Sequence, residues 1–320
     1  MKNKIIFKNI FYYPFNILPL TFISMEKWNI LKISGKDNIE YIQTKITCDL
    51  FLLKKNNFIF GSYCNEKGKV ISFFCIFYHK KEIFILIENS VIEILIKEFK
   101  KYSTFSKVFF KKNYKYLLFG IAGSKSEKII KNIFNFIPKN NNLLFKYKKS
   151  IILFFNNPSK RFLIITNYKK YLNILNNIKE KVKFNDSNQW LSLDIESGYP
   201  IINSNNINKF IPQSINIDKL KAISFKKGCY LGQEIISSFR YIKNIKKYLF
   251  SFKCFLLNKP SLGDFIETKI KKNWCNIGIV LSFCIMINNI FLIQSVIKKN
   301  INLKNIFKIK NNLFKIINKI

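Results

Sequence analysis

The sequence has few of the residues on which several common protein chemistries depend. Among its 320 residues are one histidine, His79, and two arginines, Arg161 and Arg240. A single imidazole cannot supply most zinc sites, and any Ser-His or Cys-His nucleophile would depend on this one residue. Because His79 stands beside two lysines at an expected hairpin turn, we interpret it as a surface residue. We expect no metal site.

Paired cysteines are also absent. The seven cysteines are odd in number, widely spaced, and never arranged as C-x-x-C. Neither a disulfide framework nor a thiolate zinc site is therefore indicated. This use of cysteine agrees best with a reduced, cytoplasmic setting.

Acidic residues are few, since 18 Asp and Glu face 55 Lys and Arg and give a formal net charge of +37. Such an excess points to a polyanion such as RNA, DNA or an anionic membrane. A second explanation competes: nearly all the basic residues are lysine, and Lys, Asn, Ile, Phe and Tyr are encoded by A- and T-rich codons. Arginine, which RNA-binding proteins favour for bidentate contacts, is nearly missing. The lysine excess is therefore either functional or compositional drift.

One uncharged stretch, residues 273–297, is long enough to span a bilayer. Its internal Asn and Gly residues favour a β-hairpin instead, with strands at 277–287 and 290–297 and a turn at Asn288-Asn289. We therefore expect no membrane span.

Apolar runs bounded by turn residues predict an α+β fold of antiparallel sheets with helices on one face. Strands are expected at residues 28–34, 57–63, 69–78, 83–87, 116–121, 151–155 and 162–166. Capping boxes at Asp37/Glu40, Ser90/Glu93 and Ser124/Glu127 predict the starts of three helices. Beyond Lys247 the short apolar strands indicate a small β-barrel. We accordingly divide the chain into residues 1–246 and 247–320.

A glycine-rich cysteine loop stands out at residues 224–234, with the sequence SFKKGCYLGQE. Cys229 follows Lys227 closely and precedes a helical run, two features that favour a thiolate. Glu234 lies in the first helical turn, where it would complement the helix dipole. Cys229 is thus a candidate reactive thiol, with Lys227 and Glu234 beside it. A buried structural cysteine is the alternative.

A second candidate site lies on a helix expected from Asp186 to Gly198. Trp190 and Asp194 share one face of it because they are four residues apart. An indole that stacks and a carboxylate that accepts hydrogen bonds would suit a flat, N–H-rich heterocycle. The alternative is a core tryptophan beside a solvated acid.

Three stretches carry a resemblance to a known family: QWLSLDIESGYP (189–200), FIPQ (210–213) and SFKKGCYLGQE (224–234). Their order and content resemble the YgfZ family of bacterial tRNA-modifying proteins. Further matches at Trp28, at residues 67–69 and at residues 101–108 extend the resemblance over essentially the whole chain.

The resemblance implies a folate-binding protein with an aminomethyltransferase-like fold, in which tetrahydrofolate occupies a central cavity. Trp28 and Trp190 match the tryptophans associated with folate, Asp194 lies beside them, and Cys229 matches the motif cysteine. The family supports tRNA thiolation and the iron–sulfur enzymes that perform it, with tRNA contacted directly or indirectly. We therefore expect a monomeric accessory protein, rather than a self-sufficient enzyme, that assists tRNA modification and the maturation or repair of iron–sulfur enzymes.

One departure from the family pattern follows the Gln-Glu pair. The family's arginines are shifted here to Arg240 and its Arg-Gly is missing, so a grip on a carboxylate or phosphate would depend on Lys243, Lys246 and Lys247 as point charges.

Two other functions stay open. One is a folate-dependent aminomethyl transferase in which Asp194 or Glu196 serves as the acid. The other is an RNA-binding module driven by lysine charge, whose binding would weaken steeply with salt.

Overall fold

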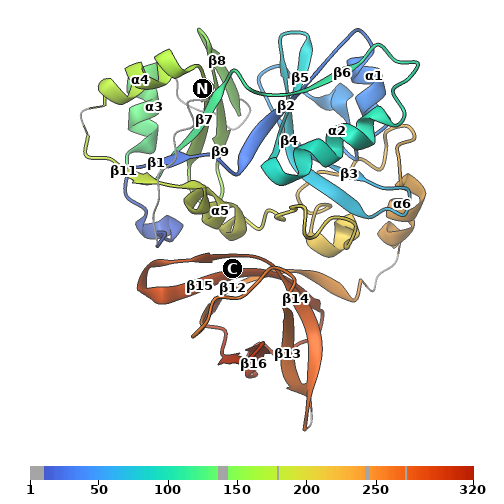
Figure 1. The fold of residues 1–320 in the computed structure, drawn as a ribbon, viewed down its shortest axis with the longest axis vertical. Helices are drawn as coiled ribbons and strands as arrows, with labels where there is room; N and C mark the ends of the chain where they lie inside the picture. The colour runs from blue at the N-terminus through green and yellow to red at the C-terminus, as the bar shows by residue number, and fades with distance from the viewer. Residues whose placement is uncertain (1–10, 136–142, 179, 242–244, 271) are drawn as a thin grey trace.

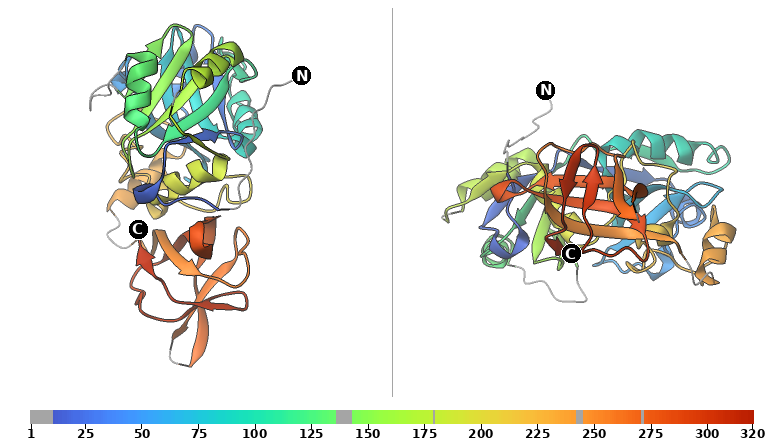
Figure 2. Two further views of the ribbon diagram at one scale, coloured as in Figure 1. Left: turned by 90° about the vertical axis from the view of Figure 1, so that its left-hand side faces the viewer. Right: turned by 90° about the horizontal axis from the view of Figure 1, so that it is seen from below.

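The structure is a computed structural model that describes residues 11–135, 143–178, 180–241, 245–270 and 272–320. The described strands form three sheets, of five, six and seven strands (Figure 1). Two of the sheets pack face to face, and the third lies beneath them (Figure 2). Single-turn 3-10 helices lie at Phe15–Ile17, Leu50–Leu52, Asn89–Val91, Pro212–Ile215 and Ile287–Asn289.

The five-stranded sheet is antiparallel, in the order β3-β4-β5-β2-β6. Its strands are β2 (Trp28–Ser34), β3 (Ile59–Cys64), β4 (Val70–His79), β5 (Glu82–Glu88) and β6 (Phe109–Lys112). Side chains alternate along β5, so that Ile83, Ile85 and Ile87 pack with the helix face while Phe84 and Leu86 face the other sheet. Helices α1 (Asn38–Gln43) and α2 (Ile92–Lys100) contribute to the helix face.

The six-stranded sheet has the order β11-β1-β7-β10-β9-β8. Its strands are β1 (Thr21–Ser24), β7 (Leu117–Ala122), β8 (Leu144–Tyr147), β9 (Ser150–Phe155), β10 (Arg161–Thr166) and β11 (Lys183–Asn185). Every residue of β9 and β10 is buried, because α3 (Ser126–Phe134) and α4 (Tyr168–Asn176) cover one face and the five-stranded sheet covers the other. The layers are therefore helix, sheet, sheet and helix.

The seven-stranded sheet is curled and is formed by residues from Lys247 onward. Its order is β17-β16-β13-β14-β15-β12-β18. Its strands are β12 (Lys247–Phe255), β13 (Phe265–Ile270), β14 (Asn273–Ile285), β15 (Ile290–Lys298), β16 (Phe307–Ile309), β17 (Asn312–Phe314) and β18 (Asn318–Lys319). The uncharged stretch forms the expected hairpin of β14 and β15, with Asn288 and Asn289 in left-handed conformations at the turn. No helix among the described residues is long and apolar enough to cross a membrane.

Helix α5 (Ser187–Glu196) lies between the two packed sheets and the curled sheet (Figures 1 and 2). Its Leu191 and Ile195 join an apolar cluster that includes Leu292 of β15. Glu196 adds a 3.0 Å ion pair to Lys253 of β12. Because every residue of α5 except Asn188 is buried, this helix is fixed from several sides. The last helix, α6 (Gln233–Tyr241), follows the Cys229 loop.

One expectation about local structure was wrong. The three capping boxes do not form, because Asp37 makes no capping hydrogen bond, and α2 and α3 begin only after Val91 and Lys125. Asp37 instead accepts a 2.7 Å hydrogen bond from the distant backbone N–H of Lys107. The sheets are antiparallel as expected, with one exception: the short edge strand β11 pairs in parallel with β1.

Candidate functional site

A cavity between the two packed sheets brings together the three residues expected to bind a cofactor. Trp28 reaches it from β2, while Trp190 and Asp194 reach it from α5. Its volume is about 50 Å³, and its other lining residues are Phe60, Phe73, Phe74, Cys75, Leu86, Ile87, Glu88, Phe155, Tyr199, Pro200, Ile201 and Ile202. Side chains from both sheets therefore wall it.

The two tryptophans of this cavity differ in how deeply they are buried. Trp190 is only 1% exposed, and its indole lies edge-on to the Phe155 ring with a centroid distance of 5.6 Å. A methyl group at Gly120 would come within 2.7 Å of the same indole, so β7 needs glycine there to leave it room. Trp28, at the first position of β2, is only partly buried. Trp190 is thus a buried wall of the cavity, whereas Trp28 is a partly exposed one.

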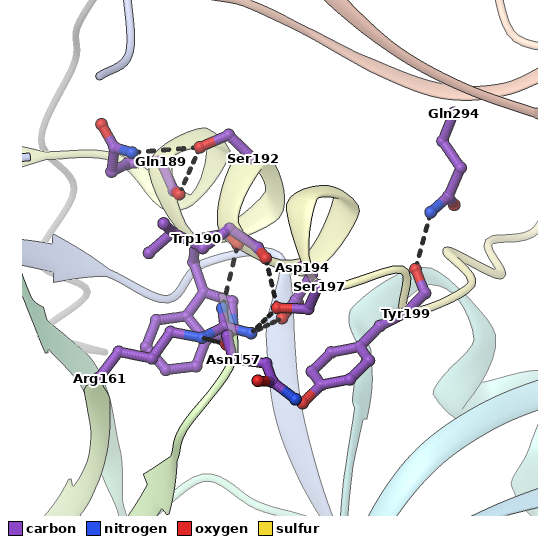
Figure 3. Close-up of polar contacts among 10 residues, drawn as sticks. Asn157, Arg161, Gln189, Trp190, Ser192, Asp194, Ser197, Tyr199 and Gln294 are labelled. Atoms are coloured by element: carbon purple, nitrogen blue, oxygen red, sulfur yellow. Dashed lines mark hydrogen bonds and ion pairs between the residues drawn. The ribbon is translucent and has the colours of Figure 1, made fainter. Parts of the chain in front are cut away.

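Arg161 packs against the Trp190 ring and is hydrogen-bonded to its surroundings. Its guanidinium donates hydrogen bonds to Asp194 Oδ1 at 2.7 Å, to the Ser197 hydroxyl at 3.3 Å and to the Asn157 carbonyl at 3.1 Å (Figure 3). Arg161 is itself fully buried. Asp194 is therefore buried and paired, not the solvated acid of the alternative interpretation.

Burial governs the electrostatics of the cavity. It raises the pKa of Asp194 above its usual range, although the Arg161 ion pair opposes this rise. Burial also raises the pKa of Glu88, against hydrogen bonds from Ser90. Both carboxylates keep further acceptor positions, since each carboxylate has about four lone-pair sites. The cavity therefore presents hydrogen-bond acceptors beside aromatic faces.

The sequence interpretation missed Arg161, Glu88 and Tyr199 as parts of this site. For Arg161 a signal existed: in a chain whose basic residues are nearly all lysine, an arginine marks a position where a planar, multiply bonded guanidinium is needed. Glu88 and Tyr199 carried no comparable signal, because only the packing of the two sheets brings them to the cavity.

The Cys229 loop lies elsewhere in the fold. Among the described residues, none of the loop lines the cavity between the sheets. Cys229 is exposed, as is Glu234 in the first turn of α6. Gly232 has a φ of +78°, and a Cβ there would lie 2.5 Å from the Asn65 carbonyl oxygen. That glycine is required by the backbone, whereas Gly228 is surrounded by open space.

Lys227 turns its amine inward from this loop. The Nζ donates to the carbonyls of Gln43, Ile46 and Cys48 at 2.6, 2.9 and 2.7 Å. These three acceptors match the three donors of an ammonium group. Burial nevertheless lowers the pKa of Lys227 to about 8. Lys227 thereby anchors the loop to residues 43–48.

Of the three lysines expected to bind an anion in place of the family's arginines, the structure describes two. Lys246 and Lys247 are exposed, and Lys243 lies outside the described residues. Arg240 stacks over the Phe225 ring at 4.8 Å. The lone histidine, His79, is half-buried against Phe84, with ring centroids 5.0 Å apart. The described part of the chain holds no cluster of three His, Cys, Asp or Glu residues suited to a metal ion.

Comparisons with known proteins agree with this architecture. A model of the YgfZ β-barrel domain matches residues 246–312. The structure is similar to the glycine cleavage system aminomethyltransferase T from Bartonella henselae, with a TM-score of 0.73 and 12% identity, over 96% of this chain and 89% of that one. This similarity confirms the expected aminomethyltransferase-like fold.

Curated relatives match at the level of sequence. The chain is 38% identical over 301 residues to the tRNA-modifying protein YgfZ of Buchnera aphidicola (strain APS), covering 93% of both chains. It is 38% identical over 296 residues to the protein of the same name from Blochmanniella pennsylvanica, covering 90% of both. With identity above 30% over nearly the full length, the chain belongs to the YgfZ family.

Proposed function

We propose that this protein binds a reduced folate in the cavity between its two packed sheets and supports tRNA modification. In this proposal it assists the thiolation of tRNA and the iron–sulfur enzymes that perform it, with Cys229 as the reactive group. The observation that carries the proposal is the convergence of Trp28, Trp190 and Asp194 on one cavity within an aminomethyltransferase-like fold. The relatives' name, tRNA-modifying protein, supports the choice of pathway.

The residues of the cavity fit part of a folate well. Folate carries a flat ring with N–H donors, which aromatic walls and buried carboxylate acceptors suit. The volume of about 50 Å³ is well below the roughly 300–1,000 Å³ of typical ligand pockets. A wall must therefore move outward when the ring enters, and we expect it to be Trp28, which is partly exposed whereas Trp190 is buried.

The carboxylates of the site would position the ligand and not transfer its protons. Asp194 holds Arg161 at 2.7 Å. Glu196 binds Lys253 through Oε1 and the Phe15 backbone N–H through Oε2. Each is already committed to holding the fold together, and this favours a binding role over general acid–base catalysis.

Tryptophan fluorescence during a tetrahydrofolate titration tests folate binding. Only Trp28, Trp190 and Trp274 can report. Trp274 lies on β14, outside the cavity lining, with the amines of Lys269 and Lys308 5.6 and 4.9 Å from its ring. We expect saturable quenching that persists in Trp274→Phe. No saturable change in either protein would overturn the folate proposal.

A folate-dependent aminomethyl transferase is the second candidate, and only the fold similarity favours it. Purified protein supplied with tetrahydrofolate and an aminomethylated carrier distinguishes the two. Robust turnover would establish the transferase and exclude the accessory role, whereas folate binding without turnover supports the accessory role.

A further inference from the structure

A second, larger cavity lies at the end of the five-stranded sheet that carries the β4–β5 turn. Its volume is about 600 Å³, within the roughly 300–1,000 Å³ range of ligand pockets. It shares no lining residue with the cavity between the sheets. We call it the lysine pocket, and its lining is Gly35, Lys36, Asn38, Ile39, Glu40, Leu50, Phe51, Leu53, Lys55, Tyr78, Lys80 and Lys81.

Charge and apolar surface are separated in the lysine pocket. Leu50 and Leu53 are buried and form an apolar base, whereas the four lysines are exposed. No ion pair joins any of these four amines to a carboxylate within the described ranges. Glu40 is the only acidic residue of the lining. The pocket therefore presents unneutralised positive charge around an apolar base.

Hydrogen bonds hold the walls of the pocket in place. The Tyr78 hydroxyl donates to the Leu50 carbonyl at 3.0 Å. The Asn38 amide donates to the Lys81 carbonyl at 3.0 Å, which ties α1 to the β4–β5 turn. The pocket is thus formed before any ligand arrives, and this reduces the entropic cost of binding.

An aromatic ring stands free in the lining. Phe51 is 69% exposed, so its ring is accessible to a ligand. Its backbone is fixed by a 3.0 Å hydrogen bond to Asp49 Oδ1. An exposed ring among lysines is the arrangement by which proteins hold single-stranded nucleic acid, because bases stack on the ring and phosphates meet the amines.

We propose that the lysine pocket binds single-stranded RNA, with a base against Phe51 and the neighbouring phosphates on Lys36, Lys55, Lys80 and Lys81. This pocket would be the surface through which the protein contacts RNA during tRNA modification. The choice of RNA as the ligand rests on that proposed function, whereas the pocket itself does not. An anionic membrane would also meet lysines and a protruding ring, but a flat bilayer surface does not fill a concavity of about 600 Å³.

The lysine pocket is connected to the Cys229 loop through one segment. Residues 43–48 receive the three hydrogen bonds from Lys227 and a fourth from the Leu231 N–H to the Thr44 carbonyl. The same segment continues into Leu50 and Phe51 of the pocket. RNA held there would therefore rest on a part of the fold to which the candidate thiol loop is attached.

Binding of a fluorescein-labelled oligouridylate, measured by anisotropy at several salt concentrations, tests the proposal on the full chain. Phe51→Ala should weaken binding roughly 5- to 150-fold, the scale of losing one stacked base. The control Phe105→Ala removes a fully exposed ring outside the pocket and should leave affinity within about twofold. Equal effects of the two substitutions would overturn the proposal.

A lysine comparison separates the pocket from the general positive charge. Lys80→Glu/Lys81→Glu should make the negative slope of log affinity against log salt less steep by at least about 1.4, since each lost phosphate contact removes about 0.7. The control Lys128→Glu/Lys131→Glu changes two exposed lysines of α3 and should leave the slope within about 0.5 of the wild type, since it removes no pocket contact. A control that flattens the slope as much would show diffuse binding and overturn the proposal. Circular dichroism verifies that all variants fold.

Two further measurements identify the class of ligand that the lysine pocket binds. Single-stranded RNA should bind more tightly than a duplex of the same sequence, because paired bases cannot enter the pocket; equal binding would overturn the proposal. If Phe51→Ala reduces sedimentation with phosphatidylserine vesicles but leaves RNA binding intact, the pocket is a membrane contact instead. Tetrahydrofolate titration of the same variants should be unchanged, so that failure of folate binding and failure of RNA binding are told apart.

Discussion

The guanidinium carbon of Arg161 lies 4.5 Å from the centroid of the Trp190 ring. Arg161 comes from β10 of the six-stranded sheet, and Trp190 from the helix that separates the packed sheets from the curled one. The contact adds a cation–π interaction to the Arg161–Asp194 ion pair. One buried arginine therefore orients both the aromatic wall and the acid of the proposed folate cavity.

Removing Arg161 should be costly to stability. Arg161→Met leaves Asp194 buried without its cation, and breaking one partner of a buried pair costs about 3–5 kcal/mol. Urea denaturation measures the loss. Arg240→Met is the matched control, because that arginine is exposed over Phe225 and should cost at most about 1 kcal/mol. Equal losses would contradict the assigned role of Arg161.

The double variant Arg161→Met/Asp194→Asn should recover part of the loss. Neutralising the orphaned carboxylate removes the uncompensated buried charge. If the double variant is as unstable as the sum of the two single variants, Arg161 and Asp194 are not coupled.

The two tryptophans should respond differently to truncation. Trp28→Ala should weaken tetrahydrofolate binding by about 1–2 kcal/mol, roughly a 5- to 30-fold rise in Kd, because it removes one aromatic face. Its partly exposed position predicts only a small loss of stability. Trp190→Ala should instead cost about 3–5 kcal/mol of stability, as large truncations in cores do.

Thermal melts and folate titrations of both variants measure these effects, and Trp190→Phe supplies a folded variant that keeps a ring. A Trp28→Ala protein with an unchanged folate Kd would remove Trp28 from the proposed site.

Much of the fold could be predicted from the sequence because its strands are short apolar runs bounded by turn residues. The strand expected at residues 28–34 is β2, and the hairpin expected around Asn288 is β14 and β15. The prediction of the capping boxes was wrong for a physical reason. Their spacing is a local signal, whereas Asp37 found a long-range partner in the Lys107 N–H, which local spacing cannot reveal.

Part of the candidate site could likewise be predicted from local spacing, and part could not. The helical spacing of Trp190 and Asp194 predicted their shared face, and both line the cavity. No local pattern could show that β10 would bring Arg161 to that face, or that the Lys227 amine would turn toward residues 43–48. Such contacts depend on tertiary packing, which joins positions far apart in the sequence.

Cys229 should be the most readily alkylated thiol of the native protein. It is the exposed cysteine, Cys275 is partly exposed, and the other five are buried. Burial raises the pKa of Cys48 and Cys64 to about 12, which makes them poor nucleophiles. Iodoacetamide labelling followed by peptide mass spectrometry should find Cys229 first, Cys275 later and the buried thiols only after unfolding.

Cys229→Ala should leave folate binding intact and abolish support of tRNA thiolation, because the thiol lies outside the cavity lining. Thiolated nucleosides from a strain carrying only this variant provide the measurement, and Cys275→Ala is the matched control. Normal thiolation in the Cys229→Ala strain would refute the assignment of Cys229 as the reactive group.

Lys227 should make stability depend on pH in a defined window. Its pKa is lowered from 10.5 to about 8 in the folded protein, so between these values the unfolded chain binds more protons than the folded one. Stability should therefore rise with pH across this window, by up to about 3 kcal/mol. Below pH 8 the buried charge is present and this contribution is lost.

The measurement is the free energy of unfolding in urea from about pH 8 to pH 10.5, taken as the difference between wild type and Lys227→Met so that other titrating groups cancel. Lys226→Met is the matched control, because it removes the same amine from an exposed position in the same loop. A difference that stays flat would mean that the carbonyls of Gln43, Ile46 and Cys48 hold the proton firmly enough to offset burial. Lys227 would then anchor the Cys229 loop as a permanent cation.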